Sequence, residues 1–442
     1  MPLDNKTALS KSNYFALIAI ILSIFFGLHT RYLVNTQTEF HVPIRADAAD
    51  FYFYAKNLKF ENTYSRSQTQ PLVSDAIRDP GFPSFASLLY SEDLREFYFR
   101  TINTQTFIQV FSFLLLTLYL LKTIGITKTA ILSLFLWNFP HFITINIYFL
   151  SESIFLSLLV LSFISFDYAI NKKDLENERK LFFISGILIG MACITRSIVM
   201  YYPVFLTLFM LTIKHDKTRS MIWYLTGSLI FILGWKARNF LIIGESSDPT
   251  LLINAIYHGS FPNFMYQNNP ETFAFPYKFD PKADQIYSGI PFTLQLIFER
   301  AIESPYAYLK WYTYGKFESL WSWDIVQGMG DIFIYPVKNS PYWHFPELSL
   351  IHSFNKILHP IILSFTGALT LFQLTKWKSL KRFKPIFPIS IVLYISTLNI
   401  IIAPFPRYGI PFKVFIFILF SIFIVNLAKI TKSYLTQHYL RD

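Results

Sequence analysis

The chain has 442 residues, of which 53% are hydrophobic, 19% aromatic and only 15% charged, with a formal net charge of +11. Soluble globular proteins carry about 25% charged residues, so this composition excludes that class. Continuous apolar runs of about 20 residues, the length that crosses a bilayer as a helix, recur along the chain. A transmembrane β-barrel would show alternation instead. We predict an all-α polytopic membrane protein, with residues 1–442 forming a single membrane domain.

About ten transmembrane helices are expected. The first apolar run lacks a small-residue cleavage site, so it reads as a helix that stays in the protein rather than a signal peptide. The two longest connections, residues 31–104 and 236–356, form large loops on one side of the membrane. The predicted spans are residues 14–33, 105–121, 129–149, 151–170, 181–196, 198–213, 220–236, 357–374, 385–403 and 408–428.

The distribution of charge predicts the orientation of these helices. The short connections and the two ends of the chain hold a clear excess of Lys and Arg, whereas the two long loops hold slightly more acids than bases. Short basic connections stay in the cytoplasm, so we place both termini there and both long loops on the outer side. The basic charge therefore reports topology, and no nucleic-acid partner is expected. A bacterial inner membrane suits the short loops, although an endoplasmic reticulum enzyme would share the topology.

The first outer loop carries two pairs of polar residues that suggest a site. Asp47 and Asp50 follow the first span, and Arg78 and Asp79 lie about thirty residues further on. Residues 51–60 read as a short helix with an apolar aromatic face. Such a helix is expected to lie along the membrane interface.

The second outer loop is too long for a plain connection and is predicted to contain helices. Two of them open at Pro291 and Pro305, since proline suits the first helical turn. Their aromatic faces indicate either anchoring at the membrane surface or the lining of an acceptor cleft. The histidines in and after this loop match no metal-binding pattern and are expected to be packed or solvated. Cys193 is the only cysteine, which excludes an intrachain disulfide and a cysteine-based zinc site.

Four charged residues lie at the outer ends of predicted spans: Glu152, Arg196, Arg238 and Arg407. Charges at this depth should face the bundle interior or a polar cavity. Helix capping is an alternative for Glu152, and snorkelling to lipid head groups is one for each arginine. Several arginines beside acids at the lipid boundary suit a substrate with a phosphate head and a lipid tail. Lys413, early in the last span, is a further candidate for phosphate binding, or for snorkelling outward or pairing with an acid.

Seven short motifs follow one another along the chain, all on its predicted outer side. They are Asp47–Leu58, Arg78–Pro83, Leu150–Phe155, Thr195–Arg196, Gly234–Phe240, Pro305–Leu309 and Arg407–Pro411. In type and order these motifs resemble those of the GT-C superfamily of membrane glycosyltransferases, which includes protein O-mannosyltransferases and aminoarabinose lipid A transferases. The second motif, for example, is similar to the family pattern Arg-x-Pro-Gly-Tyr-Pro. The resemblance covers nearly the whole chain.

The resemblance implies a GT-C-type fold and an inverting glycosyl transfer from a polyprenyl-phosphate sugar to a glycolipid, polysaccharide or protein on the outer face. The position of Asp47 implies the base that takes the proton of the acceptor. Many relatives have Glu where this chain has Ala48, so Asp50 either substitutes for that acid or supports the site. No metal or other cofactor is required, although the superfamily has metal-dependent members. The predicted catalytic residues are Asp47, Asp50 and Glu152. The predicted substrate- and phosphate-binding residues are Arg78, Asp79, Arg196, Arg238, Arg407 and Lys413.

Two other classes of protein fit some of these features. An O-antigen polymerase or ligase also pairs outer-loop arginines with lipid-linked sugars, but usually has one dominant outer loop late in the chain. A polyprenyl-lipid transporter or flippase would place charges near the midplane, in broken helices and repeated halves. This chain instead places its charges at the outer ends of the spans and shows no internal repeat.

Overall fold

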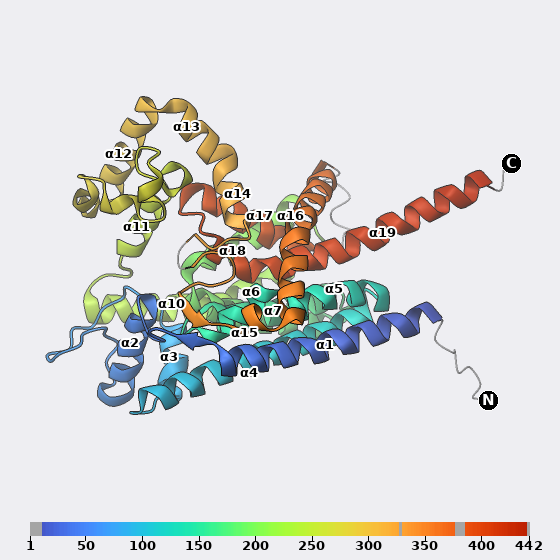
Figure 1. The fold of residues 1–442 in the computed structure, drawn as a ribbon, viewed down its shortest axis with the longest axis horizontal. Helices are drawn as coiled ribbons and strands as arrows, with labels where there is room; N and C mark the ends of the chain where they lie inside the picture. The colour runs from blue at the N-terminus through green and yellow to red at the C-terminus, as the bar shows by residue number, and fades with distance from the viewer. Residues whose placement is uncertain (1–10, 327–328, 376–384, 440–442) are drawn as a thin grey trace.

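The computed structural model describes residues 11–326, 329–375 and 385–439, and these are mostly helical. Four long helices, α1 (Lys11–Gln37), α4 (Leu94–Thr123), α7 (Glu152–Ile170) and α19 (Lys413–Tyr439), run along the long axis of the molecule (Figure 1). The start of α1 and the end of α19 lie at the same end of this bundle. The short helices of the first outer loop lie at the opposite end.

Shorter elements complete the chain. The other α-helices are α2 (Asp47–Glu61), α3 (Gly81–Leu88), α5 (Ile126–Asn138), α6 (Pro140–Thr144), α8 (Leu175–Thr195), α9 (Tyr202–Thr212), α10 (Met221–Ile243), α11 (Thr250–His258), α12 (Ile290–Glu303), α13 (Pro305–Lys310), α14 (Lys316–Trp321), α15 (Pro341–His344), α16 (Pro346–Thr375), α17 (Ile386–Ile401) and α18 (Pro406–Gly409). The short 3₁₀ helices are η1 (Ile145–Ile147), η2 (Ser197–Val199), η3 (Thr218–Ser220), η4 (Pro262–Phe264), η5 (Pro270–Thr272), η6 (Pro276–Lys278), η7 (Ala283–Ser288) and η10 (Ile410–Phe412). One π-helical turn, η8 (Trp311–Gly315), joins α13 to α14. The strands β1 (Glu39–Phe40) and β2 (Val337–Asn339) pair antiparallel and connect the two outer loops.

The predicted spans overlap helices, with residues 129–149 divided among α5, α6 and η1, but the count of about ten spans is not confirmed. Among the residues that the structure describes, six helices are long and apolar enough to cross a membrane. The segment made of α5, α6 and η1, which is bent by 50°, makes a seventh if it is one span. Two further apolar helices, Ser197–Thr212 and Ile386–Ile401, are shorter. In α8 the first turns are charged, from Glu176 to Lys180. Length and composition therefore support an integral membrane protein with six or seven clear spans.

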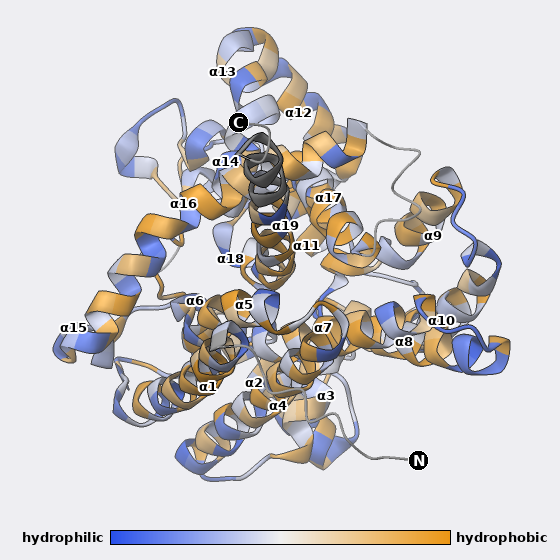
Figure 2. Ribbon diagram, turned by 90° about the vertical axis from the view of Figure 1, so that its right-hand side faces the viewer, coloured by the Kyte–Doolittle hydropathy of each residue, from blue (hydrophilic) through white to orange (hydrophobic). Residues whose placement is uncertain are grey.

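The surface of the bundle is apolar where a bilayer would meet it. The end-on view of Figure 2 shows α1 and α4 largely in the orange of hydrophobic residues. On α1, Phe15, Leu22 and Phe25 are each more than half exposed. Inside the bundle, α8 and α10 approach closely at glycines, and a Cβ on Gly186 would lie 2.9 Å from the Tyr224 carbonyl carbon. Such small-residue contacts are typical of helices packed in membranes.

The first outer loop folds onto the end of the bundle. The apolar face of α2, which was expected to meet the membrane interface, packs inside the protein, and the position of residues 51–60 along the interface stays a prediction. Phe51, Tyr54 and Ala55 are buried, and the Phe51 ring meets Phe82 of α3 at 5.1 Å. The helix also begins four residues earlier than expected, so that Asp47 and Asp50 both lie in its first turn. This packing fixes the direction in which the two acids point.

The second outer loop stands above the same end of the bundle (Figure 1). Helices α12 and α13 open with proline in their first turn, as predicted. One face of α12 leaves Leu294, Phe298 and Ile302 exposed at four-residue spacing. The loop is fastened to the bundle at Lys316, whose ammonium donates hydrogen bonds to the backbone carbonyls of residues 400–402, at the end of α17.

Candidate active site

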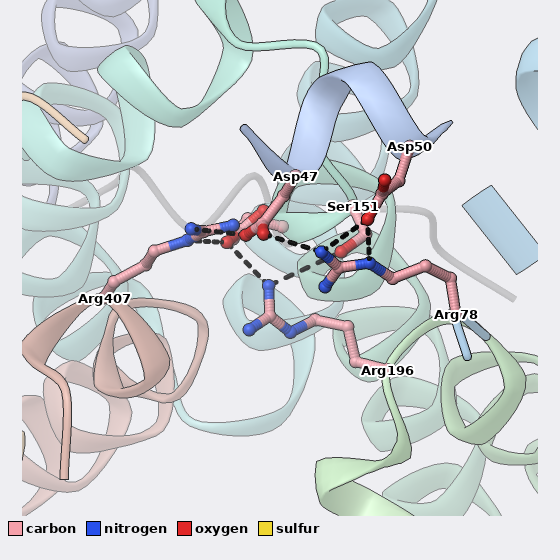
Figure 3. A network of polar contacts seen from close by, with 7 residues as sticks. Asp47, Asp50, Arg78, Ser151, Arg196 and Arg407 are labelled. Carbon is pink, nitrogen blue, oxygen red and sulfur yellow. Dashed lines mark hydrogen bonds and ion pairs between the residues drawn. The ribbon is translucent and has the colours of Figure 1, made fainter. Parts of the chain in front are cut away.

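Six charged side chains from five separate segments meet at the outer-loop end of the bundle (Figure 3). The first turn of α2 supplies Asp47 and Asp50, and the loop before α3 supplies Arg78. The first residue of α7, the residue after α8 and the short helix α18 supply the other three: Glu152, Arg196 and Arg407. The structure thus brings together six of the nine predicted site residues.

Asp47 lies at the centre of this cluster and pairs with two arginines. Its Oδ1 accepts from Arg78 Nη2 at 2.8 Å, and its Oδ2 accepts from Arg407 Nη1 at 3.1 Å. Asp50 pairs with Arg78 alone, since Oδ2 accepts from Nε at 2.9 Å and from Nη2 at 2.8 Å. The two aspartates are therefore unequal, and only Asp47 contacts both arginines.

Glu152 forms the buried base of the cluster. Its side chain is 0% exposed, and its Oε1 forms ion pairs with Arg196 Nη1, at 2.6 Å, and with Arg407. A carboxylate buried to this degree requires such ion pairs, because its hydration is lost. Glu152 lies in the first turn of α7, where no side-chain hydrogen bond caps the helix, and its carboxylate is bound to arginines. With three acids and three arginines, the cluster has no net charge.

The ion pairs change the acid–base properties of the first-loop residues. Burial alone would raise the pKa of Asp47, but the guanidiniums of Arg407 and Arg78 outweigh this effect and hold the pKa below its usual value. The two aspartates raise the pKa of Arg78 despite its burial. Asp47 is therefore a carboxylate at neutral pH, with its basicity restrained by its partners.

Asp79 lies beside the cluster and holds the segment that carries Arg196. Its Oδ2 accepts from the backbone N–H of Ser197 at 2.7 Å. Burial raises the pKa of Asp79 to about 6, against the opposing effect of that hydrogen bond. Two residues further on, Gly81 lies so close to α8 that a Cβ would be 2.8 Å from Thr195 Cα. The Pro-Gly of this motif thus permits the close approach of the two segments.

Arg238 and Lys413 lie apart from the cluster. Arg238 donates to the backbone carbonyls of Asp75, at 3.0 Å, and Tyr64, at 3.4 Å, so it fastens the first outer loop to α10. Lys413 is buried, and its ammonium donates to the Ser322 carbonyl at 3.0 Å. Phosphate binding by these two residues stays a prediction.

A cavity of about 240 Å³ opens against the cluster. Asp47, Arg78 and Arg407 line one side of it, and Asn254 and His258 of α11 line another. Sequence reasoning missed α11, which carries no Asp, Glu, Lys or Arg. Its signal was the four-residue spacing of these two polar residues, which places them on one helix face. A second cavity of about 440 Å³ lies on the other side of α2 and is lined by Asp50 and Asp75, among others.

The ion pairs leave few carboxylate oxygens of the cluster free to bind a divalent cation. Both oxygens of Asp47 and one oxygen of Glu152 are already paired with guanidiniums. Within the part of the chain that the structure describes, no group of three or more His, Cys, Asp or Glu side chains is placed to hold a metal ion. We therefore derive no step through a metal.

Comparison with known proteins gives a match in fold. No protein-family model matches the chain, and no curated protein sequence matches it. Three solved structures of the oligosaccharyltransferase AglB from Archaeoglobus fulgidus do match. The first, a complex with an inhibitory peptide and a dolichol-phosphate, has a TM-score of 0.53 at 12% identity, over 97% of this chain and 52% of that one.

The other two matches agree with the first. A form tethered to an acceptor peptide containing the NVT sequon has a TM-score of 0.52 at 11% identity, and the match covers 94% of this chain and 49% of that one. The apo form has a TM-score of 0.51 at 13% identity, and the match covers 97% of this chain and 52% of that one. The chain thus spans about half the length of these neighbours. Its fold is similar to that of these oligosaccharyltransferase structures, in line with the kind of fold that the motif order implied. At this identity the match concerns the fold, and activity has to be argued from the site.

Proposed function

We propose that the chain transfers a glycosyl group from a polyprenyl-phosphate-linked donor to a hydroxyl-bearing acceptor on the outer face of a bacterial inner membrane. The observation that carries this proposal is the placing of Asp47, Arg78 and Arg407 along one cavity. This cavity brings together a carboxylate that can accept a proton and two guanidiniums that can bind a phosphate. A dolichol-phosphate and an acceptor peptide in structures of the neighbour support a lipid-phosphate donor and a separate acceptor.

In the proposed displacement, the carboxylate acts on the attacking acceptor and the arginines act on the departing phosphate. The acceptor oxygen attacks the anomeric carbon and gives its proton to Asp47. The bond from the anomeric carbon to the phosphate oxygen breaks on the opposite side, and the lipid phosphate departs with the electron pair. Arg78 and Arg407 stabilise the charge that develops on this phosphate. The sugar is therefore transferred with inversion.

The ion pairs couple donor binding to the strength of the base. An incoming phosphate competes with Asp47 for the guanidiniums of Arg78 and Arg407. These same guanidiniums lower the pKa of Asp47, so sharing them with the phosphate makes Asp47 more basic. Glu152 and Arg196, deeper in the cluster, keep Arg407 in place during this exchange.

All donors of this kind share a lipid phosphate. Binding of a lipid phosphate therefore tests the proposal without knowledge of the sugar. The full-length protein in lipid nanodiscs is titrated with undecaprenyl phosphate and with undecaprenol. We expect the phosphate to bind at least ten-fold more tightly, and we expect Arg407→Met to remove that difference. Equal binding of both lipids to the wild-type protein would rule out phosphate recognition at this site.

Turnover then separates transfer from transport. Purified protein is incubated with radiolabelled polyprenyl-phosphate sugars and acceptor glycolipids, and free polyprenyl phosphate is measured. We expect its release to depend on Asp47. Movement of the intact donor across liposomes without its cleavage would favour a flippase instead.

A further inference from the structure

The face of α11 that lines the cavity plays no part in phosphate binding or proton transfer as proposed above. On the adjacent face of the helix, Ile253 and Tyr257 pack into a small core of the second outer loop. Tyr257 and Arg300 both bond to the buried carboxylate of Asp280, which fixes this helix in its loop. Helix α11 is thus a rigid element that presents Asn254 and His258 to the cavity.

His258 is held in a defined orientation by its neighbours. Its side chain is about nine-tenths buried, and its ring makes edge contacts with Phe264, Tyr277 and Phe405 at 4.8 to 5.6 Å between centroids. Phe405 lies two residues before Arg407, so the imidazole packs directly on the segment that carries a cluster arginine. The ring cannot turn freely within this aromatic surround.

The hydrogen bonds of His258 leave one ring nitrogen without a partner. The ring bonds to the backbone of Ala274, whose N–H already donates to the Phe264 carbonyl, so the Ala274 carbonyl accepts from the imidazole. Nε2, which is itself almost fully buried, has no partner among the residues that the structure describes, and this assigns the donating role to Nδ1. Burial lowers the pKa of His258 to about 4, so the ring is neutral at pH 7. A neutral ring that donates from Nδ1 presents a lone pair at Nε2.

The cavity therefore has two chemically different sides. One side carries the charged groups Asp47, Arg78 and Arg407, and the other carries a neutral amide and a neutral imidazole. Hydroxyl groups are recognised by neutral donors and acceptors of this kind, while phosphate is recognised by arginine. In a donor the sugar is attached directly to the phosphate, so a phosphate held by the arginines places its sugar within this cavity.

We infer that Asn254 and His258 bind the hydroxyl groups of the donor sugar, and that the unit they bind is a single monosaccharide. This inference rests on the proposed function, because the position of the phosphate sets the position of the sugar. The size follows from the cavity, which at about 240 Å³ is smaller than the roughly 300–1,000 Å³ of pockets for drug-sized ligands. His258 acts as a specificity-determining residue that accepts a hydroxyl hydrogen at Nε2.

The test compares lipid phosphates with and without a sugar on the full-length protein in nanodiscs. The probes are undecaprenyl phosphate alone and the same lipid phosphate bearing glucose, mannose, N-acetylglucosamine or a disaccharide. We expect at least one monosaccharide probe to bind about ten-fold more tightly than the bare lipid phosphate, and the disaccharide to add nothing further. Two neutral hydrogen bonds account for a gain of this size.

Two substitutions of His258 separate recognition from packing. His258→Phe keeps the ring and should lose most of the gain from the sugar, while binding of bare undecaprenyl phosphate stays unchanged and reports an intact fold. His258→Gln restores an acceptor and should recover part of the gain. The matched control is His359→Phe, because His359 is also buried among aromatic rings with an unpartnered Nε2 but does not line the cavity. This control should bind every probe as the wild type does.

The outcomes separate this inference from the proposed function. Wild-type protein that binds bare undecaprenyl phosphate but gains nothing from any sugar would overturn the inference and leave the proposed function standing. So would a His258→Phe variant that keeps the full gain. Wild-type protein that binds no lipid phosphate at all would overturn both.

Discussion

The clearest test of the site is the difference between two aspartates one helical turn apart. Asp47→Asn and Asp50→Asn each remove one negative charge from the same cluster and from the same first turn of α2. They differ in what else is lost. Asp47 contacts Arg78 and Arg407 and lines the cavity with them, whereas Asp50 contacts Arg78 alone and lines the cavity on the other side of α2.

The structure gives the expected size of each effect. Asp50 is 28% exposed, and an ion pair with this much solvent contact contributes on the order of 1 kcal/mol or less, which corresponds to about a five-fold change. Removing a general base lowers the rate by about 10²–10⁴-fold. We therefore expect Asp47→Asn to reduce glycosyl transfer at least about 100-fold, and Asp50→Asn to reduce it about five-fold or less.

The assay is release of radiolabelled sugar from polyprenyl-phosphate donors by purified protein, with rates measured at saturating donor. Binding of undecaprenyl phosphate provides the control for folding, and both variants should retain it. If the two variants lost activity equally, the special position assigned to Asp47 would be wrong. Full activity in Asp47→Asn would exclude it as the base altogether.

Three further predictions follow from the surroundings of the cluster. Glu152→Gln keeps the shape of the side chain but removes the negative charge that two arginines share. Because charge-assisted hydrogen bonds contribute roughly 1–2 kcal/mol more than neutral ones, kcat should fall about 10–100-fold. An unchanged kcat in the same transfer assay would contradict this role. The pKa of Asp79 is raised from 3.8 to about 6 in the folded protein. Its contribution to the free energy of unfolding should therefore fall by about 2–3 kcal/mol as the pH rises from 4 through 6 to 7. Thermal unfolding in detergent should show this loss in the wild type but not in Asp79→Asn. Gly81→Ala forces α3 away from α8 and should cost about 1–3 kcal/mol of stability, while Gly367→Ala, where a Cβ meets nothing within 4 Å, should leave the unfolding temperature unchanged or higher.

Much of the fold could be predicted because its signals are local. Apolar runs of sufficient length indicate helices directly, and proline at positions 291 and 305 predicted the starts of α12 and α13 to within one residue. The number of spans could not be derived in the same way. Helices such as α8 and α9 combine charge or short length with burial against neighbours, and only tertiary contacts show how they are accommodated.

The site was predictable in part for a related reason. Acids and arginines at the outer ends of apolar helices must find partners, so Glu152, Arg196 and Arg407 could be expected to face inward. Arg238 satisfied the same rule, but it lies against backbone carbonyls of the first outer loop. The sequence contained no information on which cation pairs with which acid. The buried face of α2 was misread because its partner, Phe82, lies outside the helix itself.

The neutrality of the ion-pair cluster has a consequence for turnover. An enzyme that held a lipid phosphate with three unopposed arginines would also hold its product tightly, and release would limit its rate. Here each arginine is paired with an internal carboxylate. Under the proposed function, these carboxylates would re-form their ion pairs when the phosphate departs, which would lower the affinity for the lipid phosphate and speed its exchange.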